Sequence, residues 1–431
     1  MYSDNRHTEQ TGQRKETKKK VKNMKHKLLY IVILASALAG CRQKGDIYFD
    51  PNDPINMQYT TYAKQFEAIW RGMNTHYVFW SEDQTDWDAV YNTMLPRFQE
   101  LDTKYEADGS TPDSLTLVSM YAEATKSLID HHLKLYVHDI HTGKECVYCP
   151  GLEEVKQRDY VSGQTYSYAA MKEAIDGFVK EGLLNEGTWG QIGDNLNFFG
   201  IRTVDDKKIA YLWQSSYNMN EALKQEGKTD QEKQYIQNIK SWLDMCLNEP
   251  NLLGIILDNR CNKGGNVSDL DIVIGSFIDE RLHYADLRYK EGVGRYDYTN
   301  WIPAYVEVNT NVKPRDLGKA NIPYVVLTNA FSISMAETTA QIIKTLPTGC
   351  MIGELTYGAH GQSNSYSTVF HDGAFGNPNG NHYVYTSNLQ TRFVDEGILE
   401  GKGVTPTKSI LQMESGYSGA MAKAIDYIKA Y

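Results

Sequence analysis

The chain has 431 residues, of which 41% are hydrophobic and 23% are charged. This length allows two or three domains and excludes a small protein that depends on disulfide bonds. Residues 1–40 hold nine Lys/Arg and three Asp/Glu, a net charge of +6, so residues 41–431 carry −16 of the formal total of −10. A body this acidic repels phosphate backbones, so we predict no nucleic-acid partner.

Residues 1–40 are predicted to be a signal region rather than part of the fold. Lys25 and Lys27 precede an apolar run from Leu28 to Ala39, with Met24 as the expected true start. A run of about twelve residues is too short to span a bilayer but suits the core of a signal peptide. The small residues before Cys41 resemble a bacterial lipobox, in which the cysteine is acylated and becomes the mature N-terminus.

This resemblance predicts lipidation at Cys41, and hence an exported bacterial lipoprotein that is anchored to a membrane at the periplasmic face or the cell surface. An ordinary cleaved signal with an incidental cysteine is the alternative. The other cysteines are Cys146, Cys149, Cys246, Cys261 and Cys350, an odd number that implies no complete disulfide framework. A single Cys-x-x-Cys is weak evidence for zinc, so a local disulfide or two unpaired thiols are favoured for that pair. We predict no metal and no cofactor.

Residues 41–55 are expected to be a lipidated tether and residues 56–135 an N-terminal helical domain. Apolar residues recur there at helical spacing, as at Phe66, Ile69 and Met73, and Gly109 and Pro112 interrupt the pattern. Residues 136–205 are treated as a connecting segment, with a short strand at 135–137 where it begins and a helix near 168–182.

Residues 206–431 are predicted to form an α/β core. Apolar strands are expected at 209–213, 253–258, 324–328 and 351–353, with helices at 231–247 and 334–346 between them. The run at 253–258 is almost continuously apolar, as a buried parallel strand should be. Such alternation favours an α/β layer fold.

Two loops at strand ends are candidate sites, because reactive groups in open α/β sheets gather there. The first follows the strand 253–258 and holds the pair Gly264 and Gly265, whose N–H groups could stabilise an oxyanion, although a plain turn is the alternative. The second holds Ser332 and Ser334 at the start of a helix, where free N–H groups favour an anion. On position alone, either serine could be only a helix N-cap.

These segments occur together and in order, and the combination resembles the tricorn and carboxyl-terminal-processing serine peptidase family. The segments that carry the resemblance are Asp258-Asn259-Arg260-Cys261-Asn262-Lys263-Gly264-Gly265, Ser332-Ile333-Ser334-Met335-Ala336-Glu337, Gly353-Glu354-Leu355-Thr356-Tyr357-Gly358, Glu400-Gly401-Lys402-Gly403-Val404-Thr405-Pro406 and, upstream, Leu128-Ile129-Asp130-His131-His132. The resemblance covers residues 60–431. It implies a crotonase/ClpP-like core with an N-terminal helical domain, and a site that lies between the two.

The resemblance also implies a role for each matching residue. The nucleophile falls on Ser334, the general base on His132 and the orienting acid on Glu400, as in the tricorn-like branch. The lysine of the processing-protease branch is replaced by Ala359, which excludes a Ser-Lys pair in its usual form. The implied oxyanion donors are the N–H groups of Gly264 or Gly265 and of Met335.

Departures from the family pattern leave alternatives open. His131 and His360 are rival bases, and His132 could instead be a capping histidine at a helix end. We expect a serine peptidase that cleaves peptides or unfolded proteins outside the cytoplasm. The alternative is a catalytically inactive lipoprotein that binds peptides or another ligand on the same fold.

Overall fold

The computed structural model describes residues 59–362, 373–377 and 379–431, all within one compact unit, Asp50–Tyr431. The expected lipidation site Cys41, the signal region and most of the tether lie outside the described residues. No helix in the described ranges is long and apolar enough to cross a membrane. Cys146, Cys149, Cys246, Cys261 and Cys350 are all free thiols, so the local disulfide is absent, and Cys146 lies on a strand.

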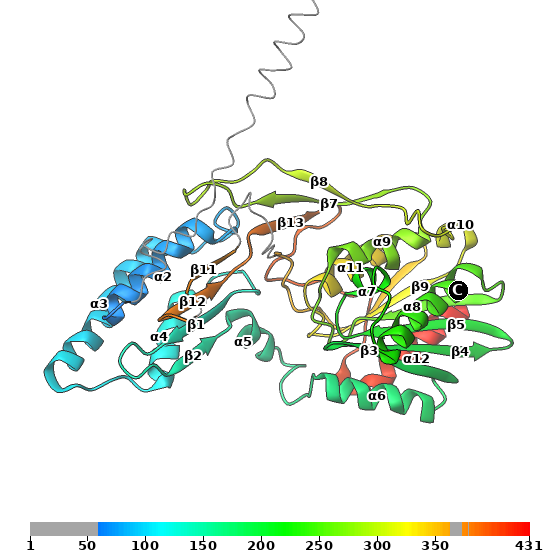
Figure 1. Ribbon diagram of the computed structural model, residues 1–431, viewed down its shortest axis with the longest axis horizontal. Coiled ribbons are helices and arrows are strands. Elements are labelled where there is room, and N and C mark those ends of the chain that lie inside the picture. Colours follow the sequence, from blue (N-terminus) through cyan, green and yellow to red (C-terminus); the bar gives the residue numbers. More distant parts are fainter. Residues whose placement is uncertain (1–58, 363–372, 378) are drawn as a thin grey trace, which may run out of the picture. The chain divides into compact units, whose positions relative to one another are not determined.

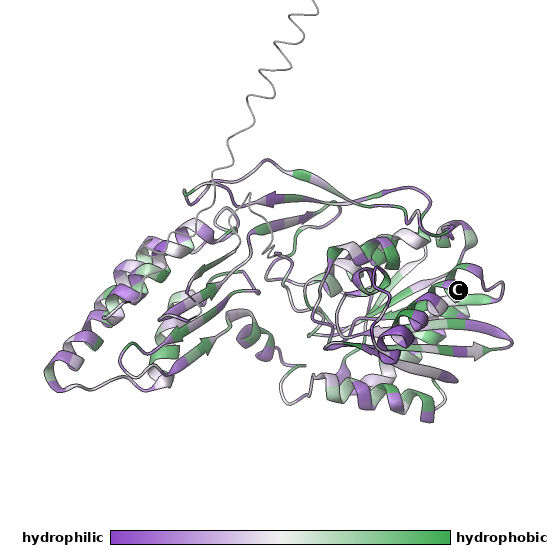
Figure 2. Ribbon diagram, in the orientation of Figure 1, coloured by the Kyte–Doolittle hydropathy of each residue, from purple (hydrophilic) through white to green (hydrophobic). Residues whose placement is uncertain are grey.

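Three helices open the described chain, as predicted: α2 (Tyr62–His76), α3 (Trp87–Asp108) and α4 (Ser114–Thr125). Each begins at a side chain that accepts a hydrogen bond from a backbone N–H, namely Thr61, Asp86 and Asp113. α3 ends at Gly109, whose left-handed φ of 72° stops the helix. Hydrophobic and hydrophilic residues alternate along α2 and α3 (Figure 2), and their apolar faces meet in one core cluster.

A four-stranded antiparallel sheet packs against these helices (Figure 1). Its order is β11–β12–β1–β2, formed by Ala374–Gly376, His382–Tyr385, Lys134–His138 and Glu145–Tyr148. Phe375 and Val384, from the end of the chain, complete the apolar cluster of the helices. The N-terminal domain expected at 56–135 therefore also includes a sheet, and two strands of this sheet, β11 and β12, come from the region 206–431 that was assigned to the core.

The main sheet has seven strands in the order β15–β10–β9–β6–β5–β4–β3. The predicted strands are present as β5 (Lys207–Gln214), β6 (Leu252–Asp258), β9 (Tyr324–Thr328) and β10 (Gly349–Gly353), which pair in parallel. β15 (Lys408–Ser409) pairs in parallel with β10. β3 (Glu186–Ile192) and β4 (Asn195–Val204) extend the sheet in antiparallel pairing, so it begins well before the expected boundary at residue 206.

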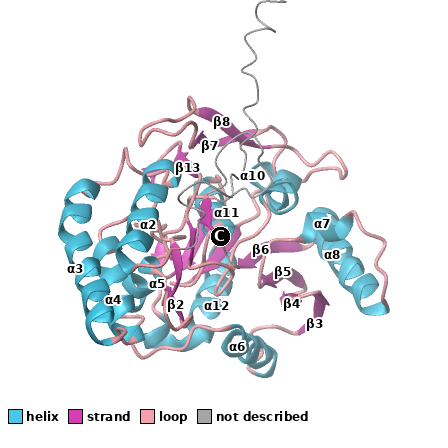
Figure 3. Cartoon of the chain, turned by 60° about the vertical axis from the view of Figure 1, so that its left-hand side comes forward, coloured by secondary structure: helices cyan, strands magenta, loops and turns pink. Residues whose placement is uncertain are grey.

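Helices cover both faces of this sheet. α8 (Asp230–Asn248) and α11 (Met335–Thr345) pack on one face, and α6 (Tyr168–Lys180) and α12 (Gln412–Ala430) pack on the other. α6 and α8 are seen on opposite sides of β3–β6 in Figure 3. The mixed α/β architecture with an N-terminal helical region agrees with the predicted fold class.

The other elements complete the core. A third sheet, β14–β13–β7–β8, is antiparallel and consists of Gly397–Ile398, Leu389–Phe393, Leu282–Tyr289 and Ile302–Val306. The short helices are α5 (Pro150–Lys156), α7 (Met219–Leu223), η2 (Val267–Asp269), α9 (Leu270–Val273), η3 (Gly275–Phe277) and α10 (Leu317–Ala320).

Candidate active site

Ser334 lies between the end of β9 and the first residue of α11. Its backbone angles, φ 60° and ψ −119°, are strained for a residue with a side chain, and the residue is partly exposed. Ser332 is fully buried, and its hydroxyl donates to the Asn259 carbonyl at 2.7 Å and accepts from the Asn329 N–H at 3.0 Å. Of the two serines, Ser334 is therefore the one that a ligand could reach.

The glycine loop after β6 lies directly against Ser334. A Cβ placed on Gly264 would lie 2.6 Å from the Ser334 Cβ and 2.9 Å from the Met335 nitrogen, and Gly264 has a φ of 88°. The Ile333 N–H donates to the Asn262 carbonyl at 2.9 Å, which joins the two loops. Only a glycine fits this approach, so the glycine pair is more than a plain turn.

The amide groups of this region differ in their availability. The Gly264 N–H donates to the Asn262 side chain at 2.8 Å and is therefore already paired. Among the described residues, no group accepts a hydrogen bond from the N–H of Gly265 or of Met335. Of the three predicted oxyanion donors, Gly265 and Met335 are the ones with a free N–H.

The two adjacent histidines have different surroundings. The His131 ring is buried, with Nδ1 2.9 Å from the Tyr357 carbonyl oxygen and Nε2 3.3 Å from a Glu154 carboxylate oxygen. The His132 ring is partly exposed, and its Nδ1 has no partner among the described residues. Burial lowers the pKa of His132, while the nearby carboxylates of Asp130 and Glu337 partly oppose that shift. Of the two histidines, His132 is the one with a partly exposed ring, although its unpartnered Nδ1 is itself buried.

Glu400 lies beside His132 but is also held by the backbone. Donor atoms of Asp130, His132 and Glu400 all lie within 4.8 Å of one another. Glu400 is buried, and its carboxylate accepts hydrogen bonds from the N–H groups of His131 (2.9 Å), His360 (2.7 Å) and Gly361 (2.5 Å). Burial raises the pKa of Glu400 well above its ordinary value, Asp130 adds to this, and the amide donors oppose it.

The Asp130 carboxylate holds the histidine segment by hydrogen bonds. Its carboxylate accepts from the His132 N–H (2.8 Å), the Thr386 hydroxyl (2.6 Å), and the N–H (2.7 Å) and hydroxyl (3.0 Å) of Ser387. These contacts join the residues before β1 to those after β12. Asp130, His132 and Glu400 could together hold a cation by their donor types, but the two carboxylates already accept seven hydrogen bonds between them. The carboxylates of Asp130 and Glu400 therefore serve mainly as hydrogen-bond acceptors rather than as ligands of a cation.

His360, the other alternative base, is buried. Its side chain is 1% exposed, and neither ring nitrogen makes a hydrogen bond to a described residue. Nε2 lies 3.5 Å from a Glu337 carboxylate oxygen. Because neither nitrogen is accessible to solvent, this ring is poorly placed to exchange a proton with a substrate. Burial also lowers the pKa of His360.

The structure brings the predicted site residues together as two groups. Ser334 lies with Gly264 and Met335, and His132 lies with Glu400. Within the described residues, no hydrogen bond joins Ser334 to His132 or His132 to Glu400. Sequence reasoning assigned no role to Asp130 or Glu337, although Asp130 stands two residues before His132 and Glu337 three residues after Ser334.

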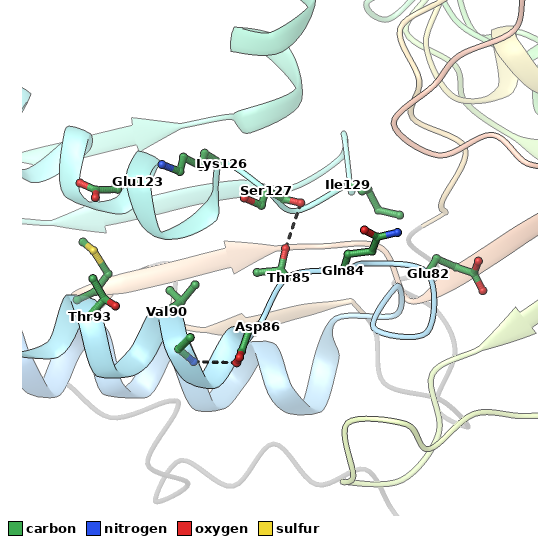
Figure 4. Close-up of a pocket in the computed structure, with 12 residues that line it drawn as sticks. Glu82, Gln84, Thr85, Asp86, Val90, Thr93, Glu123, Lys126, Ser127 and Ile129 are labelled. Atoms are coloured by element: carbon green, nitrogen blue, oxygen red, sulfur yellow. Dashed lines mark hydrogen bonds between the residues drawn. The ribbon is translucent and has the colours of Figure 1, made fainter.

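A separate pocket of about 730 Å³ lies in the N-terminal helical region (Figure 4). It is formed by the start of α3, the end of α4 and Ile129, and Thr85 donates across it to the Ser127 carbonyl at 3.2 Å. None of the predicted site residues lines it. Ile129, which lines this pocket, directly precedes Asp130 in the chain.

Comparison with known proteins agrees with the motifs. Residues 208–410 match the model of peptidase family S41, and this range contains all the quoted motifs except the upstream segment 128–132. No curated protein matches the chain at a significant level.

Solved structures extend the likeness beyond the matched range. A protein assigned as a peptidase of Parabacteroides merdae is 20% identical, with a TM-score of 0.54, and the match covers 86% of this chain and 97% of that one. Mature CPAF in complex with lactacystin is 12% identical, with a TM-score of 0.52 and coverage of 86% and 99%. At these identities the structures show a shared fold, which includes the N-terminal region as well as the core.

Proposed function

We propose that this chain, whose residues 208–410 match peptidase family S41 and whose fold is shared with peptidases, is a serine peptidase with Ser334 as its nucleophile. The family match supports a peptidase role with protein or peptide substrates. The observation that carries the proposal for the site is the contact of Gly264 with a strained, partly exposed Ser334. This contact supports the proposal because Ser334 is partly exposed and the unpaired N–H of Met335 follows it directly in the chain.

In the proposed reaction, the Ser334 hydroxyl oxygen attacks the carbonyl carbon of the scissile peptide bond, and His132 takes the hydroxyl proton. The N–H groups of Gly265 and Met335 stabilise the oxyanion, and the loss of one such donor typically costs about 2.7–4 kcal/mol. His132 then gives its proton to the departing amine, leaving an ester on Ser334. Water hydrolyses this ester by the same route in reverse, with His132 again as the base.

Glu400 has the role of the acid that orients and stabilises the protonated His132. Its place within 4.8 Å of His132 supports that role. We propose that the Asp130 carboxylate and the backbone N–H groups bound to Glu400 hold His132 and Glu400 in position. Unlike Gly265, Gly264 acts by its lack of a side chain, since its own N–H is already paired.

We also propose that the protein works outside the cytoplasm on a lipid anchor at Cys41. The basic residues, short apolar run and small residues before Cys41 support this setting. Incorporation of labelled palmitate into the expressed protein, and its loss in Cys41→Ala, is the expected result. Labelling that persists in Cys41→Ala would contradict the assignment.

A second candidate is a lipoprotein that binds peptides without cleaving them. The observation that favours it is the burial of Glu400, which raises the pKa of its carboxyl group and disfavours the charged form. A protonated Glu400 would not stabilise a positively charged His132.

Labelling with a fluorophosphonate probe separates the two candidates. The purified protein is expected to react, with the label mapped to Ser334, and Ser334→Ala and His132→Ala are expected to stay unlabelled while they keep the thermal midpoint of the parent. Failure of a well-folded parent to react, together with measurable peptide binding, would favour the binding protein.

A further inference from the structure

Glu337 is a buried carboxylate that is hydrogen-bonded to the backbone of Ser334. It is completely buried and accepts four hydrogen bonds, two on each oxygen. One oxygen accepts from the Thr356 hydroxyl and the Gly358 N–H, both at 2.6 Å. The other accepts from the Ser334 N–H at 2.9 Å and the Ala359 N–H at 2.8 Å. An ionised carboxylate, which only accepts, is the form that suits four donors.

The donors other than Ser334 all belong to the loop 356–361. Four successive amides of this loop, those of residues 358–361, point at two buried carboxylates. Gly358 and Ala359 donate to Glu337, while His360 and Gly361 donate to Glu400. Successive backbone N–H groups form a natural cradle for anions. The loop 356–361 is therefore held by hydrogen bonds to two carboxylates, that of Glu337 beside Ser334 and that of Glu400, the predicted catalytic acid.

The histidine segment is attached to the same loop. The His131 ring nitrogen Nδ1 lies 2.9 Å from the carbonyl oxygen of Tyr357, and the His131 N–H donates to Glu400. In addition, the Thr356 hydroxyl accepts from the Val404 N–H at 2.7 Å. The segments that carry Ser334, His132 and Glu400 are thus all tied to residues 356–361.

Glycine makes this arrangement possible at Gly358. Its φ of 103° aims its N–H at Glu337, and a Cβ there would lie 2.9 Å from the Nδ1 of His131. A side chain at this position would push the histidine segment away from the loop. The loop 356–361 therefore contacts both Glu337, next to the Ser334 segment, and His131, next to His132.

On the basis of the serine peptidase function proposed above, we propose that Glu337 is a positioning residue that sets the place of Ser334 relative to His132 and Glu400 through the loop 356–361. It holds the strained backbone of Ser334 by accepting its N–H. It also removes that N–H from the oxyanion site, which leaves the N–H of Met335 as the donor from this helix. Since Glu337 has no exposed surface, it acts on the reaction only through these neighbours.

Replacement of Glu337 by glutamine is the direct test. The side chain keeps its size, but one oxygen that accepts two hydrogen bonds becomes an NH₂ group that faces two donors. Asp139→Asn is the matched control, because Asp139 is also buried and accepts from the Tyr62 hydroxyl (2.7 Å) and the N–H groups of His141 (3.0 Å) and Thr142 (2.8 Å), all outside the site.

The first readout is amide hydrogen exchange of the full-length protein, which does not depend on activity. In Glu337→Gln, we expect exchange to be about tenfold faster in peptides covering both 332–338 and 356–361. Asp139→Asn should change neither. Faster exchange in 332–338 alone would overturn the proposal, because the loop would then not be held by Glu337.

The second readout is peptide cleavage. Glu337→Gln should lower kcat by about 100-fold, as expected for a small misplacement of reacting groups, with KM within about threefold of the parent. Glu337→Asp, which keeps the charge, should recover part of kcat. An unchanged kcat in folded Glu337→Gln would overturn the proposal.

If Glu337→Gln does not fold, Thr356→Val provides the same test with a smaller change, since it removes one donor to Glu337. It should lower kcat by about tenfold and increase exchange in 332–338, and an effect on neither would overturn the proposal. If the parent cleaves no peptide and does not react with a fluorophosphonate, the proposed function fails, while hydrogen exchange still decides whether Glu337 couples the two segments.

Discussion

Gly264 lies directly against Ser334 although the two residues are on different loops: a Cβ on the glycine would lie 2.6 Å from the Cβ of the serine. Gly264→Ala should therefore displace Ser334 and the Met335 N–H. We expect the rate of fluorophosphonate labelling to fall by at least about 100-fold, the effect of a small misplacement at a reacting centre. Stopped-flow or timed gel labelling measures this rate.

Gly109→Ala is the control for backbone strain alone. Gly109 also has a positive φ, 72°, but nothing lies within 4 Å of its Cβ position. This variant should lose about 1 kcal/mol of stability and keep the parent's labelling rate. Equal labelling by Gly264→Ala and the parent would show that the glycine loop does not border the reacting serine.

Substitution of the two histidines should have different effects. His132→Ala should lower kcat by about 10²–10⁴-fold, the usual contribution of a general base, with little change in thermal stability. His131→Gln removes buried contacts to Tyr357 and Glu154 and should cost about 1–3 kcal/mol of stability, with kcat affected far less. Measurement of kcat and thermal midpoints for both variants checks this, and the reverse pattern would make His131 the base.

The pH profile should reflect the lowered pKa of His132. A base must be neutral to take a proton, so kcat/KM should rise with pH and reach half its maximum below pH 6.5, the ordinary pKa of histidine. Asp130 favours the protonated ring, so its replacement in Asp130→Asn should lower the pKa further and move this limb to lower pH. A limb that moves to higher pH in this variant would contradict the assignment.

Asp269 should make stability depend on pH between about 4 and 6. It is buried and accepts from the N–H groups of Met219 and Asn220, and burial raises its pKa from 3.8 to about 6. In this range the folded protein binds more protons than the unfolded chain, so stability should fall as pH rises, by at most about 3 kcal/mol.

Denaturant unfolding at several pH values tests this expectation against Asp269→Asn. The variant loses the titrating group, so the difference in stability between it and the parent should change across this range and stay constant above pH 6. A constant difference from pH 4 to 7 would show that Asp269 is not responsible.

The sequence predicted the elements whose patterns are strong and local. The apolar runs at 253–258 and 324–328 are the central strands β6 and β9, and the helix expected from 334 is α11. It did not predict β7, β12 and β13, because these strands carry many polar and aromatic residues and pair with partners far away in the chain. It also did not predict β8 and β11, which are short edge strands. Pairing such as Leu135 with Val384 has no local signal.

The candidate site was predictable only where a motif carried it. Ser334, His132 and Glu400 came from family segments, and the structure places Glu400 near His132 and Gly264 against Ser334. The sequence motif gave no physical reason to choose His132 over His131 as the base. The difference between them lies in which distant residues each ring contacts in the folded protein. Glu337 received no role from the sequence, because its contacts with the loop 356–361 appear only in three dimensions.

The pairing of β1 with β12 has a consequence for how the protein is made. A ribosome delivers β1, just after His132, long before it delivers His382–Tyr385, so the sheet that supports the histidine stays incomplete until nearly the whole chain exists. Contacts of such long sequence separation slow folding. A nascent or truncated chain that ends before residue 374 would lack both this support and Glu400. A function that depends on both His132 and Glu400 would thus require a nearly complete chain.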